Sequence, residues 1–230
     1  MVAHLIGHYD SPFVRRVGVS LHVLGIAFER RLLSVFSDAD AMRAYNPLGR
    51  VPALVLDDGE CLVDSAAILD HIDQSVGPQR ALLPASGKAR RDALQTIALA
   101  TGVCDKAIAV TYERRKPTAK IDETWIARCC GQQAAALAAL EQRCGVAPAD
   151  AGRLTQPEIT VAAALGYMRL RQPEMLAPGR YPALESLSAR AEAHPAFVAC
   201  RPSLREIGGG PEEASAALLR LLAGPADAGP

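Results

Sequence analysis

The sequence carries no excess of charge of either sign, because its 25 Lys and Arg residues balance its 25 Asp and Glu residues. Proteins that bind nucleic acid or anionic membranes use positive patches, so we expect neither kind of partner. The chain also has no uninterrupted apolar run long enough to span a bilayer. Its first residues lack the basic and apolar regions of a signal peptide, and we therefore expect a cytoplasmic protein.

Patterns typical of metal and redox sites are missing as well. The six cysteines form no Cys-x-x-Cys pair, and they combine with the five histidines in no spacing typical of a metal site. Cys129 and Cys130 are adjacent, and on a helix their side chains point to different faces. We expect reduced thiols and no bound metal.

The composition, 50% hydrophobic and 22% charged, is typical of a soluble globular protein. A length of 230 residues is enough for one large domain or two small ones. Up to about Val76, strand-like and helix-like segments alternate, which is the pattern of a small α/β unit. The predicted order is β-α-β-α-β-β-α. The expected strands are 4–7, 28–35, 53–56 and 61–63, and the expected helices are 12–24, 38–45 and one that begins at Asp64-Ser65.

Residues 77–87 are rich in Gly and Pro and predict a linker, after which the strand signals disappear. Alanine-rich periodic segments then predict an all-helical unit, in which Thr155 and Glu158 fit a capping box. We divide the chain into 1–77, 88–205 and a C-terminal extension 206–230, with a short amphipathic helix and a disordered end. The expected helices of this second half are 89–115, 121–144, 156–171, 184–193 and 212–222.

Three local features lie on one side of the first unit if its strands form a single sheet. Ser11-Pro12-Phe13 presents a hydroxyl at a helix N-terminus, where an anion can bind, although such a cap is usually only structural. In Arg50-Val51-Pro52 a proline begins a strand, and Asp64-Ser65 begins another helix. Each feature is weak alone, but together they indicate a site.

These residues resemble the cytosolic glutathione transferases, in particular serine-type bacterial members. The resemblance rests on Ser11-Pro12-Phe13, Asn46–Leu54, Asp64–Ile68 and Thr155-x-x-Glu158, in this order, and it spans nearly the whole chain. It implies a thioredoxin-like N-terminal domain (βαβαββα), an all-helical C-terminal domain, a cis Val51-Pro52 bond, glutathione as co-substrate and a homodimer. This sequence departs from the family pattern at two positions. Asp64 stands where these transferases more often have Glu, and Glu158 stands where their capping box more often has Asp.

The resemblance also implies the roles of individual residues. Ser11 is the catalytic residue, whose hydroxyl donates a hydrogen bond to the glutathione sulfur. The backbone of Val51 pairs with the cysteinyl part, Asp64 and Ser65 hold the γ-glutamyl end, and Arg50 can approach a carboxylate. The implied glutathione-binding residues are Phe13, Arg50, Val51, Pro52, Asp64 and Ser65.

Magnitudes indicate that the Ser11 hydroxyl and the helix N-terminus together suffice to activate a thiol. Lowering a thiol pKa of about 8.5 by two units requires about 2.7 kcal/mol of differential stabilisation of the thiolate. A hydrogen bond to a charged group contributes about 1.5–3 kcal/mol and a helix N-terminus about 0.3–1 kcal/mol. No general base is needed, so we interpret His8 as a solvent-facing or loop residue, with Tyr9 as an alternative lining residue. The thiolate would attack an electrophilic carbon of a second, apolar substrate.

The pocket for that small electrophile must lie against the helical half. Apolar residues at helical spacing belong to the core more often than they line a pocket. The basic cluster Arg114-Arg115-Lys116 is most simply a solvated helix end. The candidate lining residues are Val103, Ala107, Val110, Thr111, Arg114 and Trp125.

Two other function classes remain open at this stage. A non-catalytic glutathione-binding module with protein partners would keep the fold, but it has no need of the sulfur-directed hydroxyl of Ser11. A glutathione-dependent reductase requires a cysteine nucleophile, because serine cannot form a mixed disulfide. Isomerases and dehalogenases use the same fold and thiolate, and the sequence does not separate them from conjugating enzymes. The physiological electrophile and the role of the extension are likewise left open.

Overall fold

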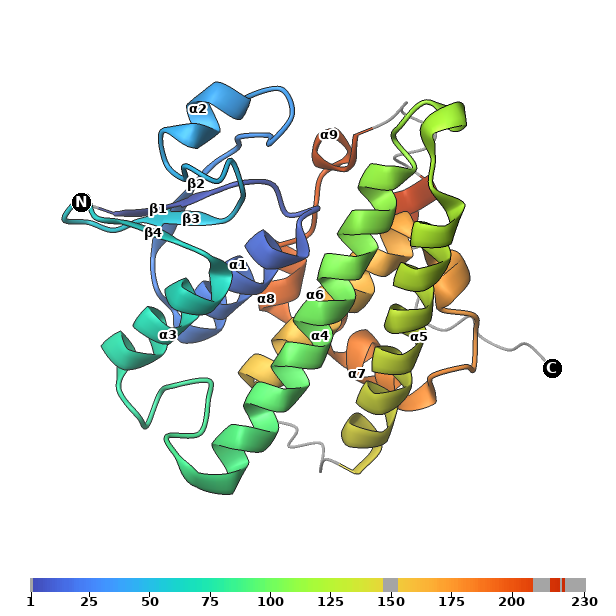
Figure 1. The fold of residues 1–230 in the computed structure, drawn as a ribbon. Coiled ribbons are helices and arrows are strands. Elements are labelled where there is room, and N and C mark those ends of the chain that lie inside the picture. Colours follow the sequence, from blue (N-terminus) through green and yellow to red (C-terminus); the bar gives the residue numbers. More distant parts are fainter. Residues whose placement is uncertain (1, 147–152, 209–215, 220, 222–230) are drawn as a thin grey trace.

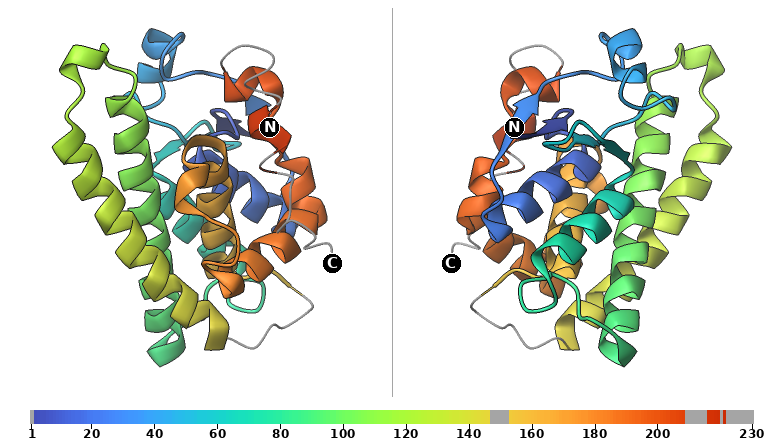
Figure 2. Two further views of the ribbon diagram at one scale, coloured as in Figure 1. Left: turned by 90° about the vertical axis from the view of Figure 1, so that its right-hand side faces the viewer. Right: turned by 90° about the vertical axis from the view of Figure 1, so that its left-hand side faces the viewer.

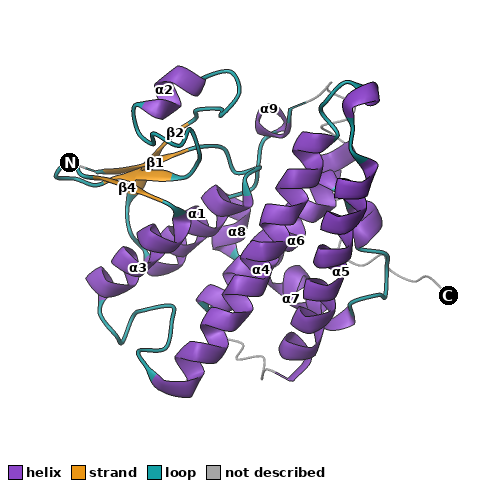
Figure 3. Ribbon diagram, in the orientation of Figure 1, coloured by secondary structure: helices purple, strands orange, loops and turns teal. Residues whose placement is uncertain are grey.

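The computed structural model describes residues 2–146, 153–208, 216–219 and 221 (Figure 1). All described strands lie in the first third of the chain, and the remainder is helical (Figure 3). The predicted order βαβαββα followed by helices is confirmed.

A four-stranded mixed sheet forms the first unit, in the order β2-β1-β3-β4. β1 runs parallel to β2 and antiparallel to β3, and β4 pairs antiparallel with β3. The central pair aligns Leu5 with Leu54 and Ile6 with Ala53. The strands are β1 (Ala3–Ile6), β2 (Phe28–Arg31), β3 (Ala53–Val55) and β4 (Cys61–Val63).

Helices cover both faces of this sheet because side chains alternate along each strand. Leu5 and Leu54 join the main core beneath α1 (Pro12–Leu24) and α3 (Ser65–Val76). Ile6 and Ala53 face the other way and pack with Met42 of α2 (Ala39–Arg43). Figure 1 accordingly has α2 on one side of the strands and α1 and α3 on the other.

The second unit is a helical bundle around α6, whose side chains are buried on nearly every face. α4 packs lengthwise against α5 and also against α6, and Figure 2 shows α4 and α5 side by side. By length and composition α4 could cross a membrane, but its packing in the bundle explains its apolar character. The helices are α4 (Gly87–Glu113), α5 (Glu123–Val146), α6 (Gln156–Arg171), α7 (Pro182–Ala193), α8 (Pro195–Ala199) and α9 (Leu204–Ile207), with 3-10 turns at Thr118–Lys120 and Pro173–Met175.

A buried ion pair joins the two units. The guanidinium of Arg15 donates two hydrogen bonds of 2.7 Å to the carboxylate of Glu192, and its Nε donates to the carbonyl of Cys200 at 3.0 Å. Arg15 is 2% exposed. α1, which begins at Ser11, is therefore fixed against α7 and α8.

Most sequence-based boundaries fall within two residues of the observed ones, with three differences. The strand expected at 28–35 ends at Arg31, because residues 32–35 leave the sheet to line a cavity. The short helices α8 and α9 were not predicted. Most of the helix expected at 212–222 lies outside the described residues, and so does the C-terminal end expected to be disordered. The described residues of that helix, 216–219 and 221, are helical. Leu221 packs on Leu170 and Ile207.

Candidate active site

Two adjoining cavities lie where the first unit meets the helical bundle. The larger, of about 760 Å³, includes Ser11 in its wall, and the smaller, of about 260 Å³, includes Pro52, Asp64 and Ser65. The predicted site residues are thus brought together around one continuous region. The residues lining both cavities are Phe13, Leu48, Arg50, Val51 and Asp105.

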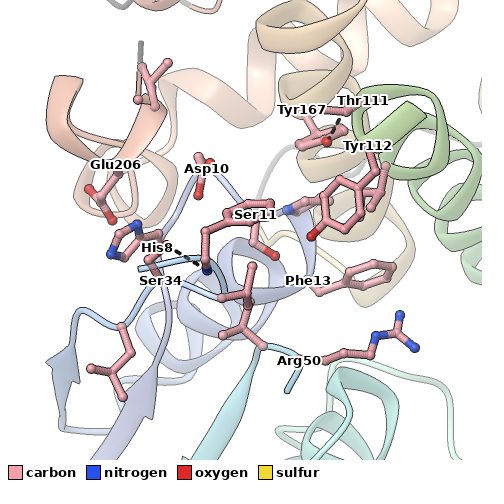
Figure 4. A pocket seen from close by; sticks show the side chains of 18 of the residues that line it. His8, Asp10, Ser11, Phe13, Ser34, Arg50, Thr111, Tyr112, Tyr167 and Glu206 are labelled. Atoms are coloured by element: carbon pink, nitrogen blue, oxygen red, sulfur yellow. Dashed lines mark hydrogen bonds between the residues drawn. The ribbon is translucent and has the colours of Figure 1, made fainter. Parts of the chain in front are cut away.

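Ser11 caps the N-terminus of α1. Its backbone is extended (φ −74°, ψ 124°), and Pro12 follows at the first helical position. The Ser11 Oγ accepts from the amide of Val14 at 3.4 Å, and among the described residues its own hydroxyl hydrogen has no acceptor. In Figure 4 this hydroxyl faces the open space of the larger cavity. A donor at a helix N-terminus is suited to stabilise an anion there.

The segment before β3 brings Val51 close to the start of α1. The Val51-Pro52 bond is cis, as the resemblance implied. Asn46 holds this segment by donating to the carbonyl of Arg50 at 2.8 Å and accepting from Leu48 N–H at 3.0 Å. Gly7, with φ +127°, leaves no room for a side chain, because a Cβ there would lie 3.0 Å from Val51 Cβ. The backbone beside Pro52 is therefore rigidly placed at the cavity wall.

Asp64 and Ser65 begin α3 at the smaller cavity. The Asp64 side chain accepts from the amide of Ala66 at 2.8 Å, which is an N-cap. Asp64 has φ 70°, a positive value seen at no other described residue except glycines. Such a conformation costs about 1–3 kcal/mol and concentrates at functional sites. Ser65 is 4% exposed, so its hydroxyl lies in the cavity wall rather than at the outer surface.

Arg50 is the exposed cation of the site. Its guanidinium lies 4.0 Å from Asp105 of α4, and both side chains are more than half exposed. Burial raises the pKa of Asp105 above its usual value, and the Arg50 charge opposes that rise. In solvent, a pair at this distance contributes little, so Arg50 is free to exchange Asp105 for another carboxylate.

The helical wall of the larger cavity differs from the one expected. Val103, Ala107 and Val110 have no exposed surface and belong to the core, because their face of α4 is turned into the bundle. Arg114 pairs with Glu174 at 3.0 Å, and Trp125 faces Lys106, so neither lines the cavity. Among the six candidates only Thr111 lines it.

The neighbouring face of α4 supplies the wall instead. Asp105, Ile108, Ala109 and Tyr112 follow the i, i+3, i+4, i+7 spacing of one helix face, and Arg115 continues it. Arg115 is therefore more than a solvated helix end: its guanidinium lies 4.2 Å from the ring centroid of Phe36, which itself contacts Tyr112. Figure 4 shows the Tyr112 hydroxyl directed toward Ser11.

His8 lies in the loop between β1 and α1, as expected, whereas Tyr9 does not line the cavity. His8 is half-buried and lines the larger cavity. Tyr9 is 1% exposed and packs in the core, with its ring centroid 3.5 Å from the Arg30 guanidinium carbon. Burial raises the pKa of Tyr9 far above its usual value, so the phenol stays protonated and out of reach of the cavity.

The C-terminal segment around α9 closes one side of the larger cavity. Glu206 accepts from the amides of Tyr9 at 2.9 Å and Ser203 at 2.8 Å and pairs with Arg30. Burial raises the pKa of Glu206, but these hydrogen bonds outweigh it and hold that pKa below its usual value. Sequence reasoning missed this wall, although Ser203-x-x-Glu206 is a readable capping box.

Asp10 and Arg171 complete the link between the segments around Ser11 and α9. Arg171 donates to Asp10 at 2.9 Å and to the carbonyl of Ile207 at 2.7 Å. Burial raises the pKa of Asp10, with Arg171 acting in the opposite direction. Within the described ranges no cluster of three His, Cys, Asp or Glu side chains could hold a metal ion, and all six cysteines are free thiols.

Comparison with known proteins agrees with this geometry. The family model "Glutathione S-transferase, N-terminal domain" matches residues 5–80, and "Glutathione S-transferase, C-terminal domain" matches 123–190. This chain belongs to the glutathione S-transferase family. The uncharacterized GST-like protein YibF of Escherichia coli (strain K12) is 32% identical to it over 182 residues, which cover 76% of this chain and 85% of YibF.

Other relatives of this glutathione S-transferase family member include an enzyme and solved structures. Maleylacetoacetate isomerase of Pseudomonas aeruginosa is 28% identical over 217 residues, covering 86% of this chain and 95% of the isomerase. A glutathione transferase family member from Pseudomonas fluorescens Pf-5, solved with bound glutathione, is 36% identical with a TM-score of 0.77, covering 87% of this chain and 99% of that one. A glutathione S-transferase from Methylobacillus flagellatus KT, solved with GSH bound, is 27% identical with a TM-score of 0.80. The match covers 87% of this chain and 100% of that one.

Proposed function

We propose that this protein binds glutathione, activates its thiol as a thiolate beside Ser11, and transfers it to small, hydrophobic electrophiles. The observation that carries the proposal is the Ser11 hydroxyl, which faces the larger cavity and whose hydrogen meets no acceptor within the described part of the chain. The structures of relatives with bound glutathione support the same ligand for this chain.

Each chemical group of glutathione has a counterpart among the residues of the two cavities. The backbone of Val51 beside Pro52 pairs with the cysteinyl part, and the N-terminus of α3 at Ser65 receives the γ-glutamyl carboxylate. Asp64 accepts from the ammonium group, and Arg50 meets the glycyl carboxylate. Phe13, on the wall common to both cavities, packs against the peptide.

Ser11 provides the rate advantage in this proposal. Its hydroxyl donates to the sulfur and thereby stabilises the thiolate over the thiol, so the sulfur proton is released to solvent at neutral pH. The thiolate then attacks the electrophilic carbon, a carbon–sulfur bond forms, and the leaving group departs with the electron pair of its own bond. The half-exposed aromatic ring of Tyr112 supports an apolar acceptor on the opposite wall.

A second candidate is isomerisation through the same thiolate. The similarity to maleylacetoacetate isomerase over 95% of that enzyme favours it specifically. In that reaction the thiolate adds to a conjugated double bond, a single bond rotates, and the thiolate leaves unchanged. A reductase is not supported, because Ser11 occupies the position where a mixed disulfide would need a cysteine.

The proposal is tested by comparing the wild type with Ser11→Ala. Two quantities are measured: glutathione binding and the turnover of a chloro-aromatic acceptor. We expect binding to be largely retained and turnover to fall at least about tenfold, since the lost hydrogen bond to a charged group contributes about 1.5 kcal/mol or more. Ser75→Ala, at the far end of α3, is the matched control and should match the wild type. Unchanged turnover in Ser11→Ala would remove the role of Ser11, and absence of glutathione binding in the wild type would refute the function.

We also propose that the protein is a cytoplasmic homodimer and that residues 1–77 and 88–205 are its two domains. The balanced charge and the relation to cytosolic transferases support this assignment. Light scattering after gel filtration should give twice the chain mass of 24.3 kDa. A single chain mass at micromolar concentration would contradict the dimer.

A further inference from the structure

Arg115 differs from the two basic residues that flank it at the end of α4. Arg114 pairs with Glu174 at 3.0 Å, and Lys116 pairs with Glu113 at 2.8 Å, and none of these four residues lines the larger cavity. Arg115 does line that cavity, and among the residues that the structure describes it has no carboxylate within 4.0 Å. One arginine of the basic cluster is therefore turned toward the site without an anionic partner.

The carboxylates that line the larger cavity are already matched by other groups. Hydrogen bonds from Ser34 and Ser37 lower the pKa of Asp38, and Arg205 adds to this effect from farther away. The remaining three carboxylates form the ion pairs Asp10–Arg171, Asp105–Arg50 and Glu206–Arg30. Within the described part of the chain, Arg115 thus keeps a positive charge on the cavity wall that no carboxylate balances.

Aromatic rings hold the Arg115 guanidinium at this wall. Its carbon lies 4.2 Å from the ring centroid of Phe36, and Phe36 meets Tyr112 edge to face with the ring centroids 5.4 Å apart. A guanidinium stacked on a ring keeps its N–H groups in its own plane, where they remain available to a carboxylate. The cation is thus oriented before a ligand binds, and this reduces the entropy cost of binding.

The larger cavity also presents apolar surface to solvent. Four large apolar side chains line it with exposed fractions between 47% and 73%, namely Leu32, Phe36, Leu48 and Tyr112. Exposed apolar side chains that gather around a pocket mark a binding surface. An acceptor with an apolar body fits these side chains, and one negative charge on it fits Arg115.

The order of residues along α4 places the charge on the acceptor. Figure 4 shows the Tyr112 hydroxyl directed toward Ser11, and Arg115 follows Tyr112 by three residues on the same helix face. Three residues of an α-helix rise by about 4.5 Å. The negative group therefore belongs at the end of the acceptor away from the carbon that reacts with sulfur.

We propose that the larger cavity selects electrophiles that carry a carboxylate on an apolar body, and that Arg115 binds this carboxylate. The inference rests on the proposed function and deepens it, because it narrows the substrate class of the same site to anionic electrophiles. Arg115 binds the acceptor and takes no part in bond making or breaking.

Two stable glutathione conjugates test the inference without a chemical step. S-(4-carboxybenzyl)glutathione and S-(4-carbamoylbenzyl)glutathione carry the same ring and differ only in a para carboxylate against a neutral amide of similar shape. In calorimetric titrations of the wild type we expect the carboxylate conjugate to bind about 5- to 20-fold more tightly, as for a charge-assisted hydrogen bond at a partly exposed site. This preference should shrink at about 1 M salt, because the exposed guanidinium is screened there.

Variants locate the preference at Arg115. Arg115→Gln should bind the two conjugates with affinities within about twofold of each other, because the charge that distinguishes them is gone. Arg115→Lys keeps the charge but loses the planar pair of donors, so it should keep part of the preference. Arg114→Gln removes a neighbouring arginine that pairs with Glu174 outside the cavity, and this control should keep the full preference.

The outcomes separate this inference from the function on which it rests. Equal wild-type affinities for the two conjugates would overturn the inference and leave glutathione binding intact. A full preference in Arg115→Gln, or an equal loss of preference in Arg114→Gln, would overturn the role of Arg115. No saturable binding of glutathione or of either conjugate would refute the proposed function itself. Because each ratio compares two ligands on one protein, a change in stability alone does not alter it.

Discussion

The two walls of the candidate site are built in different ways. On the thioredoxin-like side, backbone features form the wall: a helix cap at Ser11, a cis bond at Pro52 and a strained turn at Asp64. On the helical side, long side chains such as Tyr112 and Arg115 form it, and both are exposed. Backbone features fix a ligand's position, whereas long side chains can repack. Under the proposed function, the first wall holds the thiol of glutathione and the second wall receives the electrophile.

Gly7→Ala should break the first wall and have the largest effect on stability. A Cβ at this position would lie 2.7 Å from Val14 and 3.0 Å from Val51, at a φ of +127° that side chains rarely adopt. We expect a loss of about 2–5 kcal/mol in the free energy of unfolding, measured by urea denaturation, with loss of glutathione binding. Gly25→Ala, with φ +66° and open space around it, is the control and should lose about 1 kcal/mol. Equal losses in the two variants would show that the close approach to Val51 is unimportant.

Glu206→Gln should detach the α9 segment from the first wall. This buried carboxylate pairs with Arg30 and accepts two amide hydrogen bonds. We therefore expect the free energy of unfolding to fall by about 2–4 kcal/mol in Glu206→Gln. Because the folded pKa of Glu206 is below its usual 4.5, its contribution to stability is present above pH 4.5 and is lost as pH falls through the folded pKa. Thermal unfolding between pH 3 and 7 should therefore depend less on pH in Glu206→Gln. A parallel pH dependence in both proteins would contradict this account.

Tyr112→Ala should alter only the second wall and give the smallest effect. The half-exposed ring lines the larger cavity and contacts Phe36, so its loss removes apolar surface from the electrophile's side. We expect the KM for a hydrophobic acceptor to rise about 5- to 30-fold with glutathione affinity unchanged. Trp125→Ala removes a similarly exposed ring outside the cavity and should change neither constant. A weaker glutathione affinity in Tyr112→Ala would mean that the two walls are not independent.

The difference between the walls also decides what the sequence could predict. Ser11, Pro52 and Asp64 act through local conformation, and caps and turns have short, readable signatures. The resemblance then supplied roles for them that propensity alone could not.

The helical wall was predicted poorly because only tertiary packing decides which face of α4 is turned inward. Val103, Ala107 and Val110 form an apolar stripe that fits a pocket as well as a core, and the bundle uses it as core. The cavity takes the adjacent, more polar face, which includes Tyr112.

The most direct test of the central claim is a titration of the thiol of enzyme-bound glutathione, followed by the ultraviolet absorbance of the thiolate. Stabilisation by the Ser11 hydroxyl and the N-terminus of α1 predicts a thiol pKa of about 6.5 in the wild type. In Ser11→Ala only the helix N-terminus remains, and the thiol pKa should rise to about 8. The same pKa in both proteins would contradict the account, because the sulfur anion would then owe nothing to Ser11.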